Sequence, residues 1–184
     1  MMSRLPAPRW RGGALVALAA AIVAVAGCAA PAAPSALPAA TAAPPISPAV
    51  AATEVQLAGA LRARGLVLEE TGLVVRPGEP ASFAAVPRTA FRAILPDDPS
   101  GGLVVVYELP DVASAATAAA ELAAYVASGP GRVQYPPDAR FALRQVGSTI
   151  AFFAWSPASS PDARTADVAA AVATVGTEVP IPRG

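Results

Sequence analysis

The distribution of hydrophobic and polar positions divides the chain into three segments. Residues 14–26, ALVALAAAIVAVA, contain no polar side chain, and the residues before them carry three arginines and no acid. Residues 29–52 consist almost entirely of alanine, proline, serine and threonine. From about residue 53 onward, hydrophobic residues recur with the periods of helices and strands. The pattern predicts a leader at 1–27, a linker at 28–52 and one folded domain at 53–184.

The first helix of the domain is predicted from its ends. Thr53 and Gln56 have the spacing of a capping box, in which each side chain accepts a hydrogen bond from the backbone amide of the other residue at the start of a helix. Gly65 is a typical residue just past a helix end. The helix is therefore expected at about 54–64.

Two further helices follow from capping residues and spacing. Asp111 is placed to cap a long helix, which the Gly-Pro-Gly sequence at 129–131 would end. Ser-Pro-Asp at 160–162 predicts the start of a last helix, with proline in its first turn and Gly176 at its end. Valines recur at helical spacing along that helix, at positions Val168, Val172 and Val175.

Strands are predicted between these helices. Residues 103–107 are rich in β-branched residues, and residues 140–146 and 149–155 flank a Gly147-Ser148 turn that is typical of a hairpin. Weaker patterns predict a strand or hairpin in 66–76 and strands on both sides of Pro87 in 82–95. The expected fold is α+β. It is an antiparallel sheet of about four to six strands with about three helices packed mainly on one face.

The second strand of the hairpin is apolar on both of its faces. Either helices cover both faces of the sheet, or an apolar patch is exposed and binds a partner or a hydrophobic ligand. The candidates for such a patch are Tyr107, Phe153 and Trp155, with Arg140 and Arg144 as a charged rim. The alternative, in which these aromatic residues belong to the core, stays open at the level of sequence.

Composition excludes several kinds of chemistry. The 184 residues include 48 alanines and 21 prolines, every basic residue is arginine, and histidine and lysine are absent. Catalysis by a histidine-dependent triad, a Schiff base and a phosphate-binding loop with lysine are thereby ruled out. A single cysteine allows neither an internal disulfide nor a thiolate zinc site. No metal site and no cofactor are predicted.

The N-terminal segment has the pattern of a secretory signal peptide, with a positive stretch, an apolar stretch and small residues after it. The apolar run is shorter than the roughly 20 residues of a membrane-spanning helix. A retained span over 12–30 remains an alternative. Val25-Ala26-Gly27-Cys28 resembles the lipobox of bacterial lipoproteins, in which the cysteine thiol receives a diacylglyceryl group. Ordinary cleavage after Ala24-Val25-Ala26 is the competing interpretation.

The segment between Cys28 and the folded domain is predicted to be a disordered tether. Its prolines disfavour a helix, and its large apolar residues are too few for a core. In a polyproline II conformation it would extend about 75 Å, at roughly 3.1 Å per residue. Without residues 1–27 the chain has ten arginines and 13 acids, a net charge of −3, which argues against a nucleic-acid partner.

The chain also resembles a group of small hypothetical lipoproteins of high-GC bacteria, Chloroflexi-like and actinobacterial. The resemblance spans residues 55–176. It rests on LAGALRARG, SFAAVPRTAFRA and VVVYELPDVASAATAAAE, and on a hairpin followed by a valine-striped helix. The chain departs from the pattern in 129–146, which is longer and poorer in polar residues. The resemblance implies the order of elements and an anchored location, and it carries no catalytic residue.

Two functional hypotheses follow. The first is a lipid-anchored module on the extracytoplasmic face of the cell membrane, without catalytic activity, that binds an envelope protein or an apolar ligand or plays a structural role. An assembly factor for a transporter or envelope complex has the same sequence features as this module. The second, least favoured, is a hydrolase using two facing carboxylates. The candidate carboxylates lie in predicted turns or at strand edges: Glu69, Glu70, Asp97, Asp98 and Glu108. Asp97 and Asp98 are interpreted as part of a turn rather than as calcium ligands, because no ligand-spaced run follows them.

Overall fold

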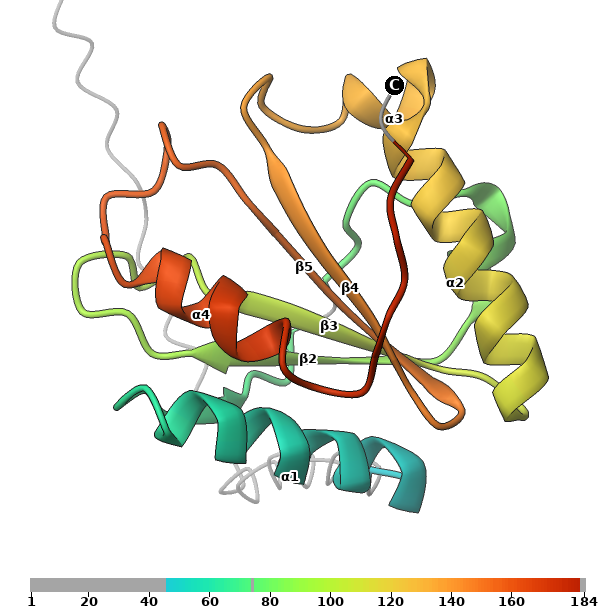
Figure 1. Ribbon diagram of the computed structural model, residues 1–184, viewed down its shortest axis with the longest axis horizontal. Helices are drawn as coiled ribbons and strands as arrows, with labels where there is room; N and C mark the ends of the chain where they lie inside the picture. Colours follow the sequence, from blue (N-terminus) through green and yellow to red (C-terminus); the bar gives the residue numbers. More distant parts are fainter. Residues whose placement is uncertain (1–45, 74, 183–184) are drawn as a thin grey trace, which may run out of the picture. The chain divides into compact units, whose positions relative to one another are not determined.

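The computed structural model describes residues 46–73 and 75–182. The predicted leader, Cys28 and the predicted tether up to Pro45 lie outside the described residues. The described part has one antiparallel sheet in the order β1-β2-β3-β5-β4-β6, which confirms the predicted α+β class (Figure 1). Its strands are β1 (Leu68–Glu70), β2 (Arg88–Ala93), β3 (Leu103–Glu108), β4 (Arg140–Val146), β5 (Thr149–Trp155) and β6 (Thr177–Glu178). Its helices are α1 (Pro48–Arg62), α2 (Val112–Ala127), α3 (Gly129–Arg132) and α4 (Thr165–Val172), with a 3₁₀ helix η1 at Ala81–Ala85.

Helices cover both faces of the sheet, so the prediction that they pack mainly on one face was wrong (Figure 1). On one face, α1 and α4 pack against the inward residues of the strands, including Phe91, Val104 and Phe153. On the other face, α2 and η1 pack against Val105, Tyr107, Phe152 and other strand residues. Burial on both sides explains why the second hairpin strand has no polar alternation.

The hairpin of β4 and β5 follows directly from its sequence. Both strands have the predicted bounds, and Val146 pairs with Thr149 across the two-residue turn. Gly147 has a φ of +56°, a conformation that a residue with a Cβ adopts at a cost. The turn therefore fixes the register that determines to which face of the sheet each side chain of the two strands points.

Helix α1 begins earlier than predicted. Its N-cap is Ser47, whose hydroxyl accepts a hydrogen bond from the Val50 amide at 3.2 Å, and Pro48 occupies the first turn. Thr53 is not a cap. It is buried inside the helix, where its hydroxyl donates to the Ala49 carbonyl and lies 2.7 Å from the Thr149 hydroxyl. Proline is compatible with a first helical turn, so five residues assigned to the tether are helical.

The other predicted helix starts have different outcomes. The Asp111 carboxylate accepts a hydrogen bond from the Ser114 amide at 2.7 Å and caps α2 as expected. Helix α4 begins at Thr165 rather than after Pro161. Asp162 instead accepts hydrogen bonds from the amides of Asp97 and Arg164, and so it holds two loops together.

One strand prediction was wrong and one strand was missed. The residues before Pro87, predicted to form a strand, form η1 instead, and Phe83 of η1 is buried in the core under α2. The short strand β6, which pairs with β4 at the sheet edge, was not predicted because its two residues carry no periodic signal. Within the described residues no helix is both long enough and apolar enough to span a bilayer.

Candidate functional site

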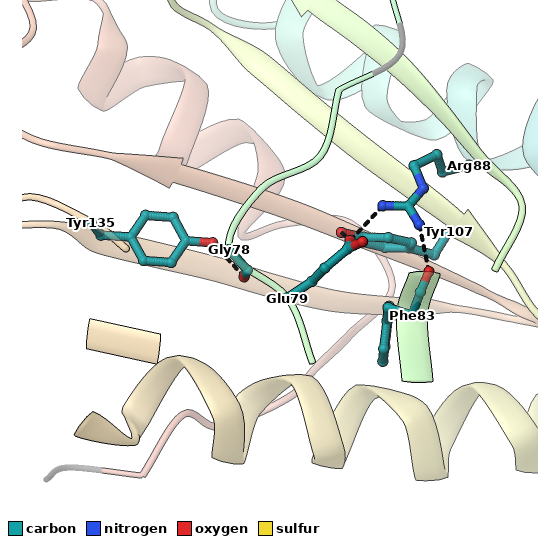
Figure 2. A network of polar contacts seen from close by, with 6 residues as sticks. All are labelled: Gly78, Glu79, Phe83, Arg88, Tyr107 and Tyr135. Atoms are coloured by element: carbon teal, nitrogen blue, oxygen red, sulfur yellow. Dashed lines mark hydrogen bonds and ion pairs between the residues drawn. The ribbon is translucent and has the colours of Figure 1, made fainter. Parts of the chain in front are cut away.

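The most developed polar cluster lies where residues 75–80, called the strap, cross the α2 face of the sheet (Figure 2). The strap has no regular secondary structure. At Gly78 an added Cβ would lie 2.7 Å from the Cβ of Gln134, so only glycine fits this close approach. The strap therefore passes close to Gln134 and Tyr135, in the segment that follows α3.

Two tyrosines and an ion pair hold the strap in place (Figure 2). The Tyr135 hydroxyl donates to the Gly78 carbonyl at 2.8 Å, and the Tyr107 hydroxyl donates to Glu79 Oε2 at 2.8 Å. Arg88 donates to the same Glu79 oxygen at 2.5 Å and to the Phe83 carbonyl. The Arg88 guanidinium also lies over the Tyr107 ring, 5.1 Å from its centre. The network thus joins the strap to β2, β3 and η1.

Burial determines the electrostatics of this network. The Arg88 and Glu79 side chains are each only 9% exposed, and Tyr107 is fully buried. Desolvation, reinforced by the hydrogen bond to Glu79, raises the pKa of Tyr107 well above its ordinary value. Desolvation likewise raises the pKa of Tyr135. Both hydroxyls are consequently neutral donors at physiological pH.

We expect the protein to lose stability in alkali as a result. The unfolded chain ionises its tyrosines near their ordinary pKa of 10.0, whereas the folded chain keeps Tyr107 and Tyr135 protonated to higher pH. The contribution of these two tyrosines to the free energy of unfolding should therefore be constant below about pH 10 and fall above it. Denaturation curves at increasing pH measure this. A Tyr107→Phe variant should lose stability less steeply, and an equal slope would contradict the assignment.

Beside the network, the strap forms one wall of a pocket of about 270 Å³, called the strap pocket. The sheet forms the floor of the pocket. The segment that comes after α3 in the chain forms the wall opposite the strap. The pocket is lined by Val75 and Pro77 of the strap, Leu103, Val105, Phe152 and Ala154 of the floor, Tyr135, Pro136 and Ala139 opposite, and Trp155 and Ser156 at one end. Most of these side chains are apolar, so the pocket suits an apolar group.

The polar groups beside the pocket already have partners. The Ser156 hydroxyl donates to Asp138 Oδ1 at 2.6 Å, and the other oxygen of Asp138 accepts from the Ala158 amide. These hydrogen bonds lower the pKa of Asp138, which is exposed to solvent. Tyr135 and Glu79 are engaged as described above. These polar groups therefore hold the walls of the pocket in place. A ligand in the pocket would be held mainly by apolar contacts.

The aromatic residues predicted to form an exposed patch do not form one. Tyr107 is fully buried on the α2 face, whereas Phe153 is 1% exposed on the opposite face. Trp155 is half-buried and stacks on Phe153 with ring centres 5.2 Å apart. The prediction was wrong for Tyr107 and Phe153 because β-branched and aromatic runs in a doubly covered sheet are core on both faces.

The two predicted rim arginines have different roles. Arg140 is exposed and pairs with Trp155 across the hairpin, and the two residues line one hollow beside α4. Arg144 is buried, and its guanidinium donates to the carbonyls of Val175 and Gly176 at 2.7 and 3.0 Å. Arg144 therefore closes the end of α4 onto β4, and only Trp155 and Arg140 remain together at the surface.

The candidate carboxylates whose contacts are defined have structural roles. Asp98 accepts hydrogen bonds from Ser100 and the Gly101 amide within one turn, and its other oxygen accepts one from the Ser160 hydroxyl. Glu69 and Glu70 are exposed on the edge strand β1, on opposite faces of it. Among residues 46–73 and 75–182, no three acidic, cysteine or histidine side chains are placed to share a metal ion.

Sequence reasoning did not find the strap. Glu79 and Arg88 are nine residues apart on either side of η1, and Tyr135 follows α3, so no local period connects them. The available signal was the unusual placement of one acid and one glycine between prolines at 77–80. Comparisons with protein-family models, with curated proteins and with solved structures found no match.

Proposed function

We propose that the chain is a bacterial lipoprotein, anchored through Cys28 on the extracytoplasmic face of the cell membrane, whose domain binds a ligand without transforming it. The anchor is supported by the position of the only cysteine. Cys28 closes the apolar run, and small residues precede it. Two acyl chains hold a protein stably at a membrane, because each buried CH₂ contributes about 0.8 kcal/mol.

The observation that supports a binding role is the strap pocket. An apolar hollow on a covered sheet is where a domain of this size binds a small molecule. The strap that walls it is held by an ion pair of which each side chain is 9% exposed. Such a pair fixes the position of the strap but adds little net stability to the fold, because the cost of desolvating the two charges offsets much of their attraction. A segment of irregular backbone is thus kept in one position beside an apolar pocket.

The same contacts favour binding over catalysis in this proposal. A general acid or base needs a proton that it can exchange near neutral pH. The Tyr107 hydroxyl is held as a donor to Glu79, and its raised pKa opposes exchange. The Glu79 carboxylate is occupied by Arg88 and Tyr107 together.

Acyl labelling tests the anchor. In cells that produce the full chain and are fed an alkyne-bearing palmitate, we expect the protein to become labelled. A Cys28→Ser variant should lose the label, because the lipid is transferred to a thiol. A Ser35→Ala variant, changed in the same segment, should retain it. Unlabelled wild-type protein, or label that persists in Cys28→Ser, would contradict the proposal.

A further inference from the structure

The strap pocket is bordered by positive charge on one side. Arg76 stands in the strap between two residues that line the pocket, Val75 and Pro77, and its side chain is exposed. Arg92 of β2 pairs with Leu103, which is part of the floor. Paired residues of antiparallel strands point to the same face with Cβ atoms about 5 Å apart. Two arginines therefore come from segments that border the pocket, Arg76 from the strap and Arg92 from the strand beside its floor.

Arg92 has unused donor capacity. Its Nε is buried and has no hydrogen-bond partner among the residues that the structure describes. A buried donor without an acceptor is costly, so a shift of the Arg92 side chain that brings this donor to a ligand acceptor would be favoured. A carboxylate matches the planar donor arrangement of a guanidinium.

The acids near this side do not cancel the charge by pairing. Glu69 faces Arg92 across β1 and β2 but is exposed. The ion pairs within 4.0 Å in the described part join Arg64 with Asp167, Arg88 with Glu79, and Arg144 with Glu178, and they include neither Arg76 nor Arg92. Asp138 lies at the opposite end of the pocket, beside Ser156, and both of its oxygens accept hydrogen bonds there. The pocket is thus apolar inside, cationic on one side and anionic at the far end.

We propose that the strap pocket binds an amphipathic anion, namely an unbranched acyl chain that carries a single carboxylate. The chain lies on the floor of Leu103, Val105, Phe152 and Ala154, and the carboxylate contacts Arg76 and Arg92 away from Asp138. A volume of about 270 Å³ corresponds to about nine water molecules at roughly 30 Å³ each, which a medium-length chain can displace. This inference rests on the binding role proposed above and names its ligand class.

Calorimetric titration of the full chain in phosphatidylcholine nanodiscs tests the inference, with empty nanodiscs as the blank. Decanoate should bind, and octanoate should bind about 15-fold more weakly, since each methylene contributes about fourfold. The neutral 1-decanol should bind more weakly than decanoate, and decyltrimethylammonium should show no binding above the blank. Comparing the affinities of decyl phosphate and decanoate shows whether the site prefers a phosphate or a carboxylate head group. Tighter binding of decyl phosphate than of decanoate would overturn the assigned class.

Three variants locate the site. Arg76→Gln should weaken decanoate binding about threefold to fivefold and leave 1-decanol unchanged, because an exposed charge contact contributes modestly. Arg62→Gln removes an exposed arginine from α1, on the other face of the sheet, and should change neither. Ala154→Leu fills the floor and should abolish binding of both compounds. A denaturation curve for each variant shows whether the fold is retained.

The outcomes separate this inference from the proposed function. Equal affinity for decanoate and 1-decanol overturns the anionic ligand and leaves an apolar binding module. Decanoate binding that Ala154→Leu does not reduce overturns the strap pocket as its site. If no compound binds above the blank, both the ligand class and the binding role fail. The lipid anchor is unaffected by any of these results, because acyl labelling measures it independently.

Discussion

Replacing Glu79 with alanine is expected to lower the free energy of unfolding by about 3 kcal/mol. The substitution leaves the Arg88 guanidinium, whose side chain is 9% exposed, without its counter-ion. The expected loss is at the lower end of the range for a broken buried pair. Arg88 keeps its hydrogen bond to the Phe83 carbonyl and its contact with the Tyr107 ring. Urea denaturation followed by circular dichroism measures the difference.

Matched variants separate the ion pair from the hydrogen bond. Tyr107→Phe removes one donor to Glu79 and should lower the free energy of unfolding by about 1 kcal/mol. Asp167→Asn breaks the exposed pair with Arg64, whose charged atoms are 3.7 Å apart, and should change stability by less than about 1 kcal/mol. If Glu79→Ala costs no more than Asp167→Asn, the strap is not held by a buried pair.

Replacing Phe153 with alanine is expected to lower the free energy of unfolding by about 3–5 kcal/mol. Phe153 is 1% exposed and packs in the core between the sheet and helices α1 and α4. The substitution removes a large buried side chain and leaves a cavity that close packing cannot fill. It also removes the ring on which Trp155 stacks. Thermal and urea denaturation both report the change.

Trp155 provides the control for this prediction. Its side chain is half-buried at the end of β5, so Trp155→Ala should cost less stability than Phe153→Ala. An exposed binding patch would give the opposite result. In that case Phe153→Ala would leave stability nearly unchanged and would reduce binding of a partner instead.

The elements that could be predicted from sequence are those whose signals are local. The hairpin of β4 and β5 has a two-residue turn between strongly apolar strands, and α2 has a capping aspartate followed by a regular apolar stripe. Each of these signals lies within one element or at its end. They sufficed for the α+β class and for the antiparallel arrangement.

The errors arose where tertiary contacts overrode the local pattern. Ser47-Pro48 begins a helix and Ser160-Pro161 does not, although both have the same sequence signal. The difference lies in Asp162, whose carboxylate is used by two loop amides, one of them 65 positions away in the chain. A contact of that range has no trace in the sequence near the helix start.

The candidate site was least predictable for the same reason. The strap pocket combines five strand residues, two strap residues and the segment after α3, which only the fold brings together. The sequence pattern suggested an exposed patch containing Tyr107 and Phe153, whereas both side chains are buried. Phe153 pairs with Val104, and Tyr107 lies three positions further along β3, so the two aromatic side chains point to opposite faces of the sheet. Strand register decides this, and register was not available from the sequence.

Intact mass spectrometry of the protein isolated from its membrane fraction tests the central claim most directly. The proposal predicts a chain that begins at Cys28 and carries the mass of a diacylglyceryl group, with a further acyl group where the N-terminus is acylated. A chain that begins at Gly27 without lipid would indicate a secreted protein. A full-length chain would indicate a retained span over 12–30. Either of these two masses would contradict the lipid-anchored assignment.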